Sequence, residues 1–270
     1  MLGAIFGDMV GAPYEFNNIH TKEFPLVSRR TGFTDDTVMT VAVAAALLES
    51  KGKGEKETKE SLIRWMKHYG QMYPDAGYGG RFFHWVLSDE TRPYNSYGNG
   101  SAMRVSSAGW LYDTLEETEE KAGWTAEVTH NHPEGIKGAK ATAAAIFLAR
   151  TGTAKEDILK YITDTYGYDL SENTDSIRKW YYFNETCQKT VPQAIRVFYE
   201  SKDYEDTIRL GVSLGGDSDT LACIAGGIAE AYYGMPEELK KKALELLTPE
   251  LREPVFRFQE TTKMKNGEDR

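Results

Sequence analysis

Two short segments of this chain place carboxylates beside hydroxyls. They are Thr34-Asp35-Asp36-Thr37 and, about 180 residues later, Asp217-Ser218-Asp219-Thr220. Each comes directly before an apolar stretch with helical spacing, so its carboxylates can face the unpaired N–H groups of a first helical turn. Either segment alone is typical of a helix cap. Together they also offer a set of oxygen ligands.

The combined charge of these segments indicates a need for cations. If they meet in the fold, four carboxylates converge, and each like-charge pair at about 4 Å costs on the order of 4 kcal/mol at an effective dielectric constant near 20. Neither segment contains cysteine or histidine, which favours Mg²⁺, Mn²⁺ or Ca²⁺ over zinc. Two divalent ions would bring a charge of +4 against −4 from the four carboxylates, or against −5 if Glu15 joins them. Paired metals suit hydrolysis because they bind substrate oxygens and activate water.

Apolar residues at helical spacing predict the elements that must position these groups. The predicted helices lie around residues 38–48, 62–69, 135–150, 158–166, 191–200, 220–233 and 236–247. Thr153 and Glu156 fit a capping box at the start of one helix, and Gly234 is expected to end another. Period-two alternation is nearly absent, so we predict an all-α fold.

Composition limits the remaining possibilities. The 270 residues are 40% hydrophobic and 27% charged, and we expect a single domain over residues 1–259 followed by a polar C-terminal tail at 260–270. The longest apolar run, Val41 to Leu48, is too short to span a bilayer. With two cysteines and no basic leader, we expect a cytoplasmic protein without a disulfide framework.

The net charge of −9 argues against broad attraction to nucleic acid or anionic membranes. A phosphate-bearing ligand would have to be held locally, by a metal, a helix N-terminus or a few basic groups.

Five motifs, in order, resemble the ADP-ribosylglycohydrolase family, which includes the dinitrogenase-reductase-activating glycohydrolases and the ADP-ribosyl-acceptor hydrolases. The resemblance extends from Gly3 to about Gly234. The motifs are Gly7 to Glu15, Phe33 to Thr37, Gly98 to Arg104, Thr129-His130 with Gly138-Ala139, and Gly215 to Thr220. The resemblance implies a single-domain orthogonal helical bundle that binds two Mg²⁺ or Mn²⁺ ions. It further implies hydrolysis of the bond between ADP-ribose and a modified acceptor, which could be a protein side chain or a small ADP-ribosyl compound.

The resemblance also implies roles for particular residues. The implied metal ligands are Thr34, Asp35, Asp36, Asp217, Asp219 and Thr220. The carboxylates expected to take part in catalysis are Glu15, Asp36 and Asp219, with Glu15 on a mobile segment. The backbone of Gly98, Asn99, Gly100 and Ser101 is expected to cradle the phosphates, with His130 near the nucleotide and Tyr97 a candidate for stacking on adenine.

Two features of this chain depart from relatives. Eighteen residues separate Glu15 from Thr34, which implies a short flap, and Asn95-Ser96-Tyr97 stands where some members place an aspartate. The acceptor therefore stays open among arginine, serine, a nucleic-acid end and a small molecule. We expect a monomer with no membrane partner, and nucleic acid only as an ADP-ribosylated end.

Two other functions are compatible with the same residues. One is an ADP-ribose or nucleotide-binding protein without turnover. The other is a two-metal hydrolase of a different glycosidic or phosphoester substrate.

Overall fold

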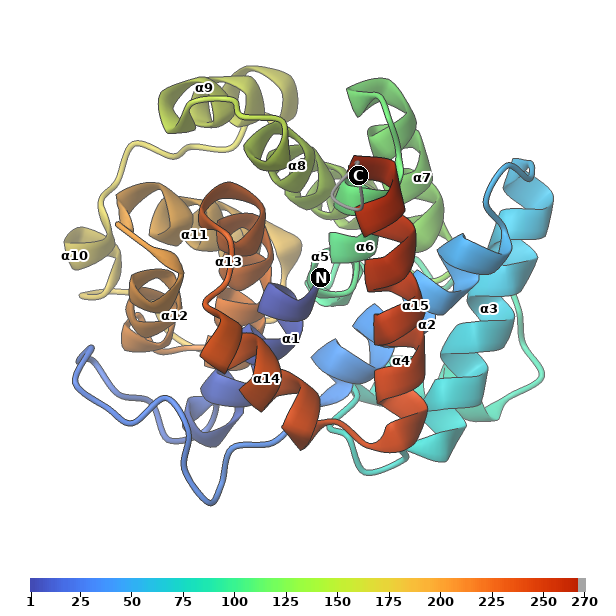
Figure 1. Cartoon of the computed structure of the whole chain (residues 1–270), viewed down its shortest axis with the longest axis horizontal. Helices are drawn as coiled ribbons and strands as arrows, with labels where there is room; N and C mark the ends of the chain where they lie inside the picture. The colour runs from blue at the N-terminus through green and yellow to red at the C-terminus, as the bar shows by residue number, and fades with distance from the viewer. Residues whose placement is uncertain (267–270) are drawn as a thin grey trace.

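Helices form the whole framework of the protein in a computed structural model, which describes residues 1–266, with side chains described through residue 262 (Figure 1). The helices are α1 (Leu2–Gly11), α2 (Asp35–Glu49), α3 (Glu55–Met72), α4 (Gly80–Leu87), α5 (Gly100–Met103), α6 (Ser106–Leu111), α7 (Leu115–Glu127), α8 (Pro133–Arg150), α9 (Lys155–Tyr166), α10 (Thr174–Ile177), α11 (Cys187–Glu200), α12 (Tyr204–Ser213), α13 (Ser218–Tyr233), α14 (Glu237–Leu246) and α15 (Pro249–Asn266), with a 3-10 helix η1 (Ala12–Tyr14).

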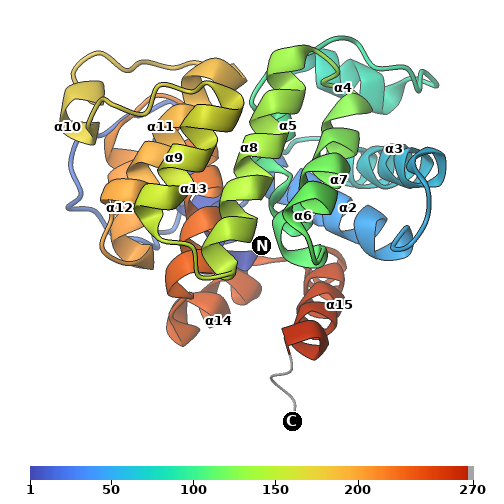
Figure 2. The same ribbon diagram turned by 90° about the horizontal axis from the view of Figure 1, so that it is seen from above.

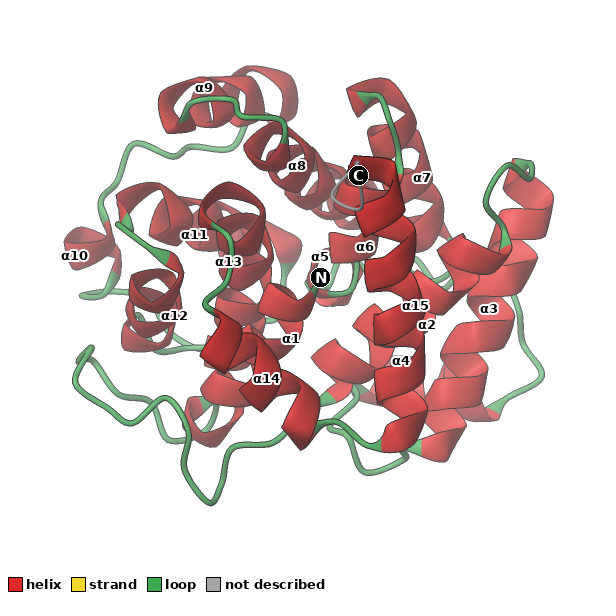
Figure 3. Cartoon of the chain, viewed as in Figure 1, coloured by secondary structure: helices red, strands yellow, loops and turns green. Residues whose placement is uncertain are grey.

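The predicted all-α fold is confirmed. Within the described residues no strand occurs, and the single β-type feature is an isolated antiparallel bridge between Gly98 and Thr186 (Figure 3). Figure 2 shows helices running in several directions rather than along one common axis. None of the helices in this part of the chain is long and apolar enough to cross a bilayer.

The core is built around α1 and α13, which lie side by side near the middle of the molecule (Figure 1). Every residue of α1 is buried, as is α13 from Ser218 to Ala229. Helices apolar on all sides belong in a core. Such a helix has no polar face, which explains why periodicity did not predict α1. One cluster of buried apolar side chains extends from Met1 to Phe258.

Glycines allow α1 and α13 to approach backbone to backbone. A Cβ atom at Gly7 would lie 2.1 Å from the carbonyl oxygen of Ala222, and one at Gly11 would lie 2.4 Å from the Cα of Asp219. Residues four apart share a helix face, so this close contact extends along α1 to its C-terminal end. The start of α13 is therefore fixed beside the end of α1.

One local sequence prediction was wrong at a helix start. The capping box at Thr153 does not form, because the Thr153 N–H donates to Leu148 O at 3.0 Å and closes the last turn of α8 together with Gly152, whose φ is +84°. Helix α9 begins at Lys155 with Ala154 as its N-cap. The capping bond of this type forms instead at Thr114, which accepts from the Glu117 N–H at 3.1 Å.

The predicted end of one helix agrees with the structure. Gly234 ends α13 as expected, with a φ of +76°.

The polar segment predicted as a tail from residue 260 is helical as far as Asn266, so the 259/260 boundary falls inside α15. Residues 267–270 lie outside the described residues.

The contact between α1 and α13 can be tested with Gly7→Ala. Alanine should gain up to about 1 kcal/mol from helix propensity, but its methyl group would press on a backbone carbonyl that cannot rotate away. We expect a net loss of about 1–3 kcal/mol in the free energy of unfolding, measured by urea denaturation. The control is Gly32→Ala, because a Cβ atom at Gly32 meets nothing within 4 Å. Equal stability of the two variants would contradict the close packing.

Candidate active site

Asp8 fixes the first acidic segment from inside the core. Its fully buried carboxylate accepts hydrogen bonds from the Thr34 N–H at 3.0 Å and the Thr34 hydroxyl at 2.7 Å. It also accepts from the Thr37 N–H at 3.1 Å and from the Thr37 hydroxyl. Burial raises the pKa of Asp8, although these four bonds favour its charged form. The start of α2 is thus attached to α1 by one side chain.

Asp35 and Asp36 occupy the first turn of α2. The Asp35 N–H donates to Ala76 O at 2.8 Å, and Thr34, the N-cap, accepts from the Asp36 N–H at 3.3 Å. Burial raises the pKa of both carboxyl groups well above the usual value, with further contributions from neighbouring carboxylates. The Oδ2 atom of Asp36 is buried without a hydrogen-bond partner.

The second acidic segment meets the first, which is the condition on which the charge argument rested. Thr220 donates its hydroxyl to Asp36 Oδ1 at 3.3 Å. Asp217 and Asp219 follow Gly215 and Gly216, whose positive φ values of +75° and +67° make the tight turn into α13. One carboxylate oxygen each from Glu15, Asp217 and Asp219 lie within 4.8 Å of one another.

Neighbouring carboxylates raise the pKa of Glu15 and of Asp219. Burial, followed by repulsion from Asp217, Asp8 and Glu185, raises the pKa of Glu15 to about 7. Burial and then Asp217 raise the pKa of Asp219 well above its usual value. At 4.8 Å and an effective dielectric constant of 20, each pair of charges would repel by about 3 kcal/mol.

The donor set fits a hard divalent cation. It consists of clustered carboxylate oxygens, a nearby threonine hydroxyl and the unpartnered Oδ2 of Asp36, and oxygen-rich sites of this kind bind Mg²⁺, Mn²⁺ or Ca²⁺. Of the six predicted ligands, five line one open cavity of about 310 Å³; these are Asp35, Asp36, Asp217, Asp219 and Thr220. Thr34 does not line it, since its hydroxyl is bonded to Asp8 and caps α2.

The glycine loop before α5 lines the same cavity. Gly98, Asn99 and Gly100 line it, whereas Ser101 is buried behind them and donates its hydroxyl to Gly135 O at 2.7 Å. The His130 ring packs closely against the loop. A Cβ atom added at Gly100 would lie only 3.1 Å from His130 Nε2. Burial, and then the charges of Arg104 and Arg81, lower the pKa of His130 well below its usual value. The His130 ring is therefore neutral at pH 7.

Tyr97 lies outside the cavity lining. Its side chain is 47% exposed and packs edge-on against His132, with ring centroids 5.2 Å apart. Tyr94 lines the cavity instead, with the Arg81 guanidinium 5.0 Å from its ring centroid. The structure therefore does not bring the predicted stacking residue to the site.

The sequence did not predict two arginine side chains and two carboxylates at this site. Arg81, Arg104 and Glu185 line the cavity, and Asp8 supports it from below. Burial lowers the pKa of Arg104 to about 10, so it stays charged at neutral pH. A signal existed for Asp8, which is the one charged residue in the apolar run Leu2–Gly11, and Arg104 ends the motif that begins at Gly98.

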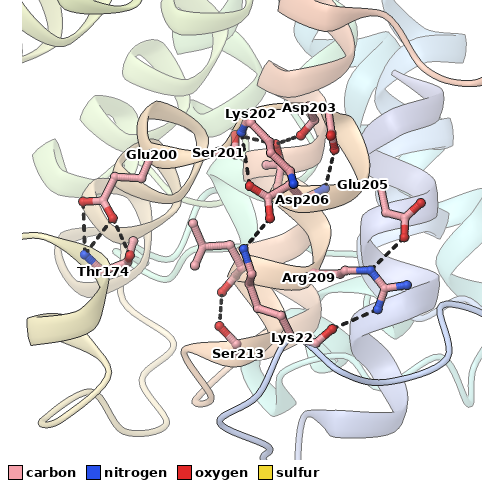
Figure 4. Close-up of polar contacts among 12 residues, drawn as sticks. Lys22, Thr174, Glu200, Ser201, Lys202, Asp203, Glu205, Asp206, Arg209 and Ser213 are labelled. Atoms are coloured by element: carbon pink, nitrogen blue, oxygen red, sulfur yellow. Dashed lines mark hydrogen bonds and ion pairs between the residues drawn. The ribbon is translucent and has the colours of Figure 1, made fainter.

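The segment that carries Glu15 is anchored at two places. The Asn18 amide bonds to Gly216 in both directions, accepting from its N–H at 2.8 Å and donating to its carbonyl oxygen at 2.9 Å. Further along, Lys22 pairs with Asp206, and Arg209 donates to Lys22 O at 2.9 Å (Figure 4). Arg209 also donates to Phe24 O at 2.6 Å. The segment between Glu15 and Thr34 thus rests on α12 and on the turn before Asp217.

Asp8→Ala tests the attachment of α2 to α1. It removes the acceptor of four donors and leaves one buried and one partly buried backbone N–H group without that partner, so we expect a loss of about 3 kcal/mol in unfolding free energy. The matched variant Asp8→Asn keeps one acceptor oxygen and should lose less. Chemical denaturation of the three proteins measures the difference, and an alanine variant as stable as wild type would contradict the role of Asp8.

Arg209→Ala tests the anchor on α12. We expect faster amide hydrogen exchange over residues 15–33, because two carbonyl groups of that segment lose their donor. Glu205→Ala is the control, since it removes the ion pair at 2.8 Å and leaves Arg209 able to reach the segment. Unchanged exchange in Arg209→Ala would show that the segment does not depend on the bonds from Arg209.

Comparison with known proteins gives a consistent result. A family model described as ADP-ribosylglycohydrolase matches residues 1–264. ADP-ribosylhydrolase ARH3 from Mus musculus is 27% identical, and the match covers 88% of this chain and 83% of that protein. ADP-ribosylarginine hydrolase Tri1 from Pseudomonas putida is 26% identical, with 95% and 76% covered. A solved structure described as an ADP-ribosylglycohydrolase-related protein complex matches with a TM-score of 0.67 at 24% identity over 97% of each chain, which bears on the fold.

Proposed function

This chain belongs to the ADP-ribosylglycohydrolase family, whose members hydrolyse ADP-ribose linkages, and we propose that it cleaves the glycosidic bond between ADP-ribose and a modified acceptor at a site for two divalent cations, Mg²⁺ or Mn²⁺. One observation carries the proposal. The acidic segments from α2 and α13 converge with Glu15 in one cavity that also contains the glycine loop and two arginines.

The acidic side of the cavity would hold the cations. Asp35, Asp36, Asp217, Asp219 and Thr220 would supply oxygen ligands. Bound cations supply Lewis-acid polarisation and make water a better nucleophile near neutral pH. They would also relieve the repulsion among the carboxylates, which is why the cluster can persist in the fold.

The side chains of the acidic cluster also suit the bond-breaking step. Water adds to the anomeric carbon, the bond to the acceptor breaks, and the charge that develops on the sugar resembles an oxocarbenium ion. Carboxylates such as Asp36 and Asp219 stabilise that positive charge. Glu15 faces the cluster from a separate segment and can take the proton released by the water, while the leaving acceptor gains a proton.

The glycine loop and the arginines of the cavity would bind the pyrophosphate. Gly98, Asn99 and Gly100 line the cavity, and Arg81 and Arg104 add positive charge at the same cavity. This local arrangement allows an anionic ligand to bind to a chain whose net charge is −9. A cytoplasmic location and a monomeric state stay predictions from the sequence.

Asp36→Ala and Asp219→Ala test the proposed chemistry. We expect each to lower kcat by about 10²–10⁴-fold, because each removes a carboxylate from the acidic side of the cavity. Without metal, both variants should be at least as stable as wild type, since a repelling charge has gone. The assay is release of ADP-ribose from matched arginine-linked and serine-linked peptides with Mg²⁺ or Mn²⁺, which also identifies the acceptor.

Three outcomes would count against the proposal. Full activity after thorough metal removal would contradict a metal-dependent reaction. Tight, metal-dependent ADP-ribose binding without release from any substrate would favour a binding protein. Turnover of phosphodiesters in the same panel, with no turnover of ADP-ribosyl peptides, would favour a different hydrolase.

A further inference from the structure

The side chain of Asn99 connects the glycine loop to the acidic cluster. Its Nδ2 atom donates to Asp217 Oδ2 at 2.6 Å and to Thr190 Oγ1 at 3.0 Å, so both amide hydrogens have acceptors. The residue is only 6% exposed. We infer that Asn99 is a positioning residue that holds Asp217 in the orientation required to bind a divalent cation, an inference that rests on the proposed function.

Asp217 needs such a restraint because of its neighbours. Its carboxylate lies within 4.8 Å of those of Glu15 and Asp219, and repulsion favours any rotation that separates the three charges. The bond from Asn99 opposes that rotation. Hydrogen bonds from outer groups to ligating side chains typically affect metal affinity by about 10–100-fold.

The chemical type of the donor also matters. An amide is neutral, so it can orient the carboxylate and leave its negative charge available to a cation. A lysine or arginine at this position would offset that charge and repel the cation. Asparagine therefore combines orientation with an undiminished site charge.

Asn99 is itself held in place on both sides. Its N–H donates to Glu185 O at 2.7 Å, and its carbonyl oxygen accepts from the Ala102 and Met103 N–H groups at 2.8 and 3.0 Å. Thr190, its other side-chain partner on α11, donates its hydroxyl to Asn184 O at 3.1 Å. The amide is thus fixed before any ligand binds, which distinguishes it from a flexible surface side chain.

The test measures Mn²⁺ binding by calorimetry in the full-length protein without any ADP-ribosyl compound. Asn99→Ala should bind Mn²⁺ about 10–100-fold more weakly than wild type. Asn99→Leu, which keeps the side-chain volume and removes the donor, should show the same loss and guards against poor folding of the alanine variant. Circular dichroism and urea denaturation give the folded fraction of each protein.

Thr190→Val is the matched control. It removes the other acceptor of the Asn99 amide and leaves the bond to Asp217, so Mn²⁺ affinity should stay within about threefold of wild type. A loss equal to that of Asn99→Ala would mean that general loosening is responsible and would overturn the inference. Wild-type affinity in both folded Asn99 variants would overturn it as well. Absence of Mn²⁺ binding by the wild-type protein would instead overturn the metal-dependent function, and the inference with it.

Discussion

The backbone contact between α1 and α13 is the constraint on which the rest of the structure depends. Gly7 and Gly11 let the two helices touch without intervening side chains. Helix α1 then lies next to three parts of the site. Asp219, in the first turn of α13, lies against the end of α1. Glu15 follows directly after η1. Asp8, on α1 itself, reaches the start of α2 and fixes its first turn. Segments far apart in the sequence therefore meet because α1 touches each of them.

The acidic cluster destabilises this arrangement. Burial and mutual repulsion raise the pKa of Glu15, Asp35, Asp36 and Asp219, so the metal-free cluster opposes folding at neutral pH. The fold resists this with bonds from neutral donors, namely Thr220 to Asp36 and Asn99 to Asp217. Neutral donors orient the carboxylates and preserve their charge. A site built with compensating lysines or arginines would be more stable when empty and less able to attract a cation.

Sequence reasoning predicted the part of the site that is written in short motifs. The two acidic segments were identified from charge alone, and the structure brings them together through Thr220 and Asp36. Asp8 was missed because a lone acidic residue in an apolar helix gives no indication of which helix it will cap. Asn99 was assigned to the phosphates through its backbone, yet its side chain bonds to Asp217. Both omissions concern partners more than 20 residues distant, and single-sequence patterns carry no information at that range. The failure to predict α1 has a different cause. Its burial on all sides removes the periodicity that reveals amphipathic helices such as α9.

The cavity is lined by side chains of both signs of charge, and this bears on how a ligand would lie in it under the proposed function. Carboxylates from α2 and α13 repel phosphates and attract cations, whereas Arg81 and Arg104 do the reverse. An ADP-ribosyl compound has its negative charge in the pyrophosphate and none on the distal ribose. The favourable orientation therefore places the pyrophosphate toward the arginines and the distal ribose toward the carboxylates. His130, whose pKa is lowered, adds no positive charge between them and can contact the ligand as a neutral ring. Under the proposed function, this charge pattern favours the orientation that brings the distal ribose to the carboxylates.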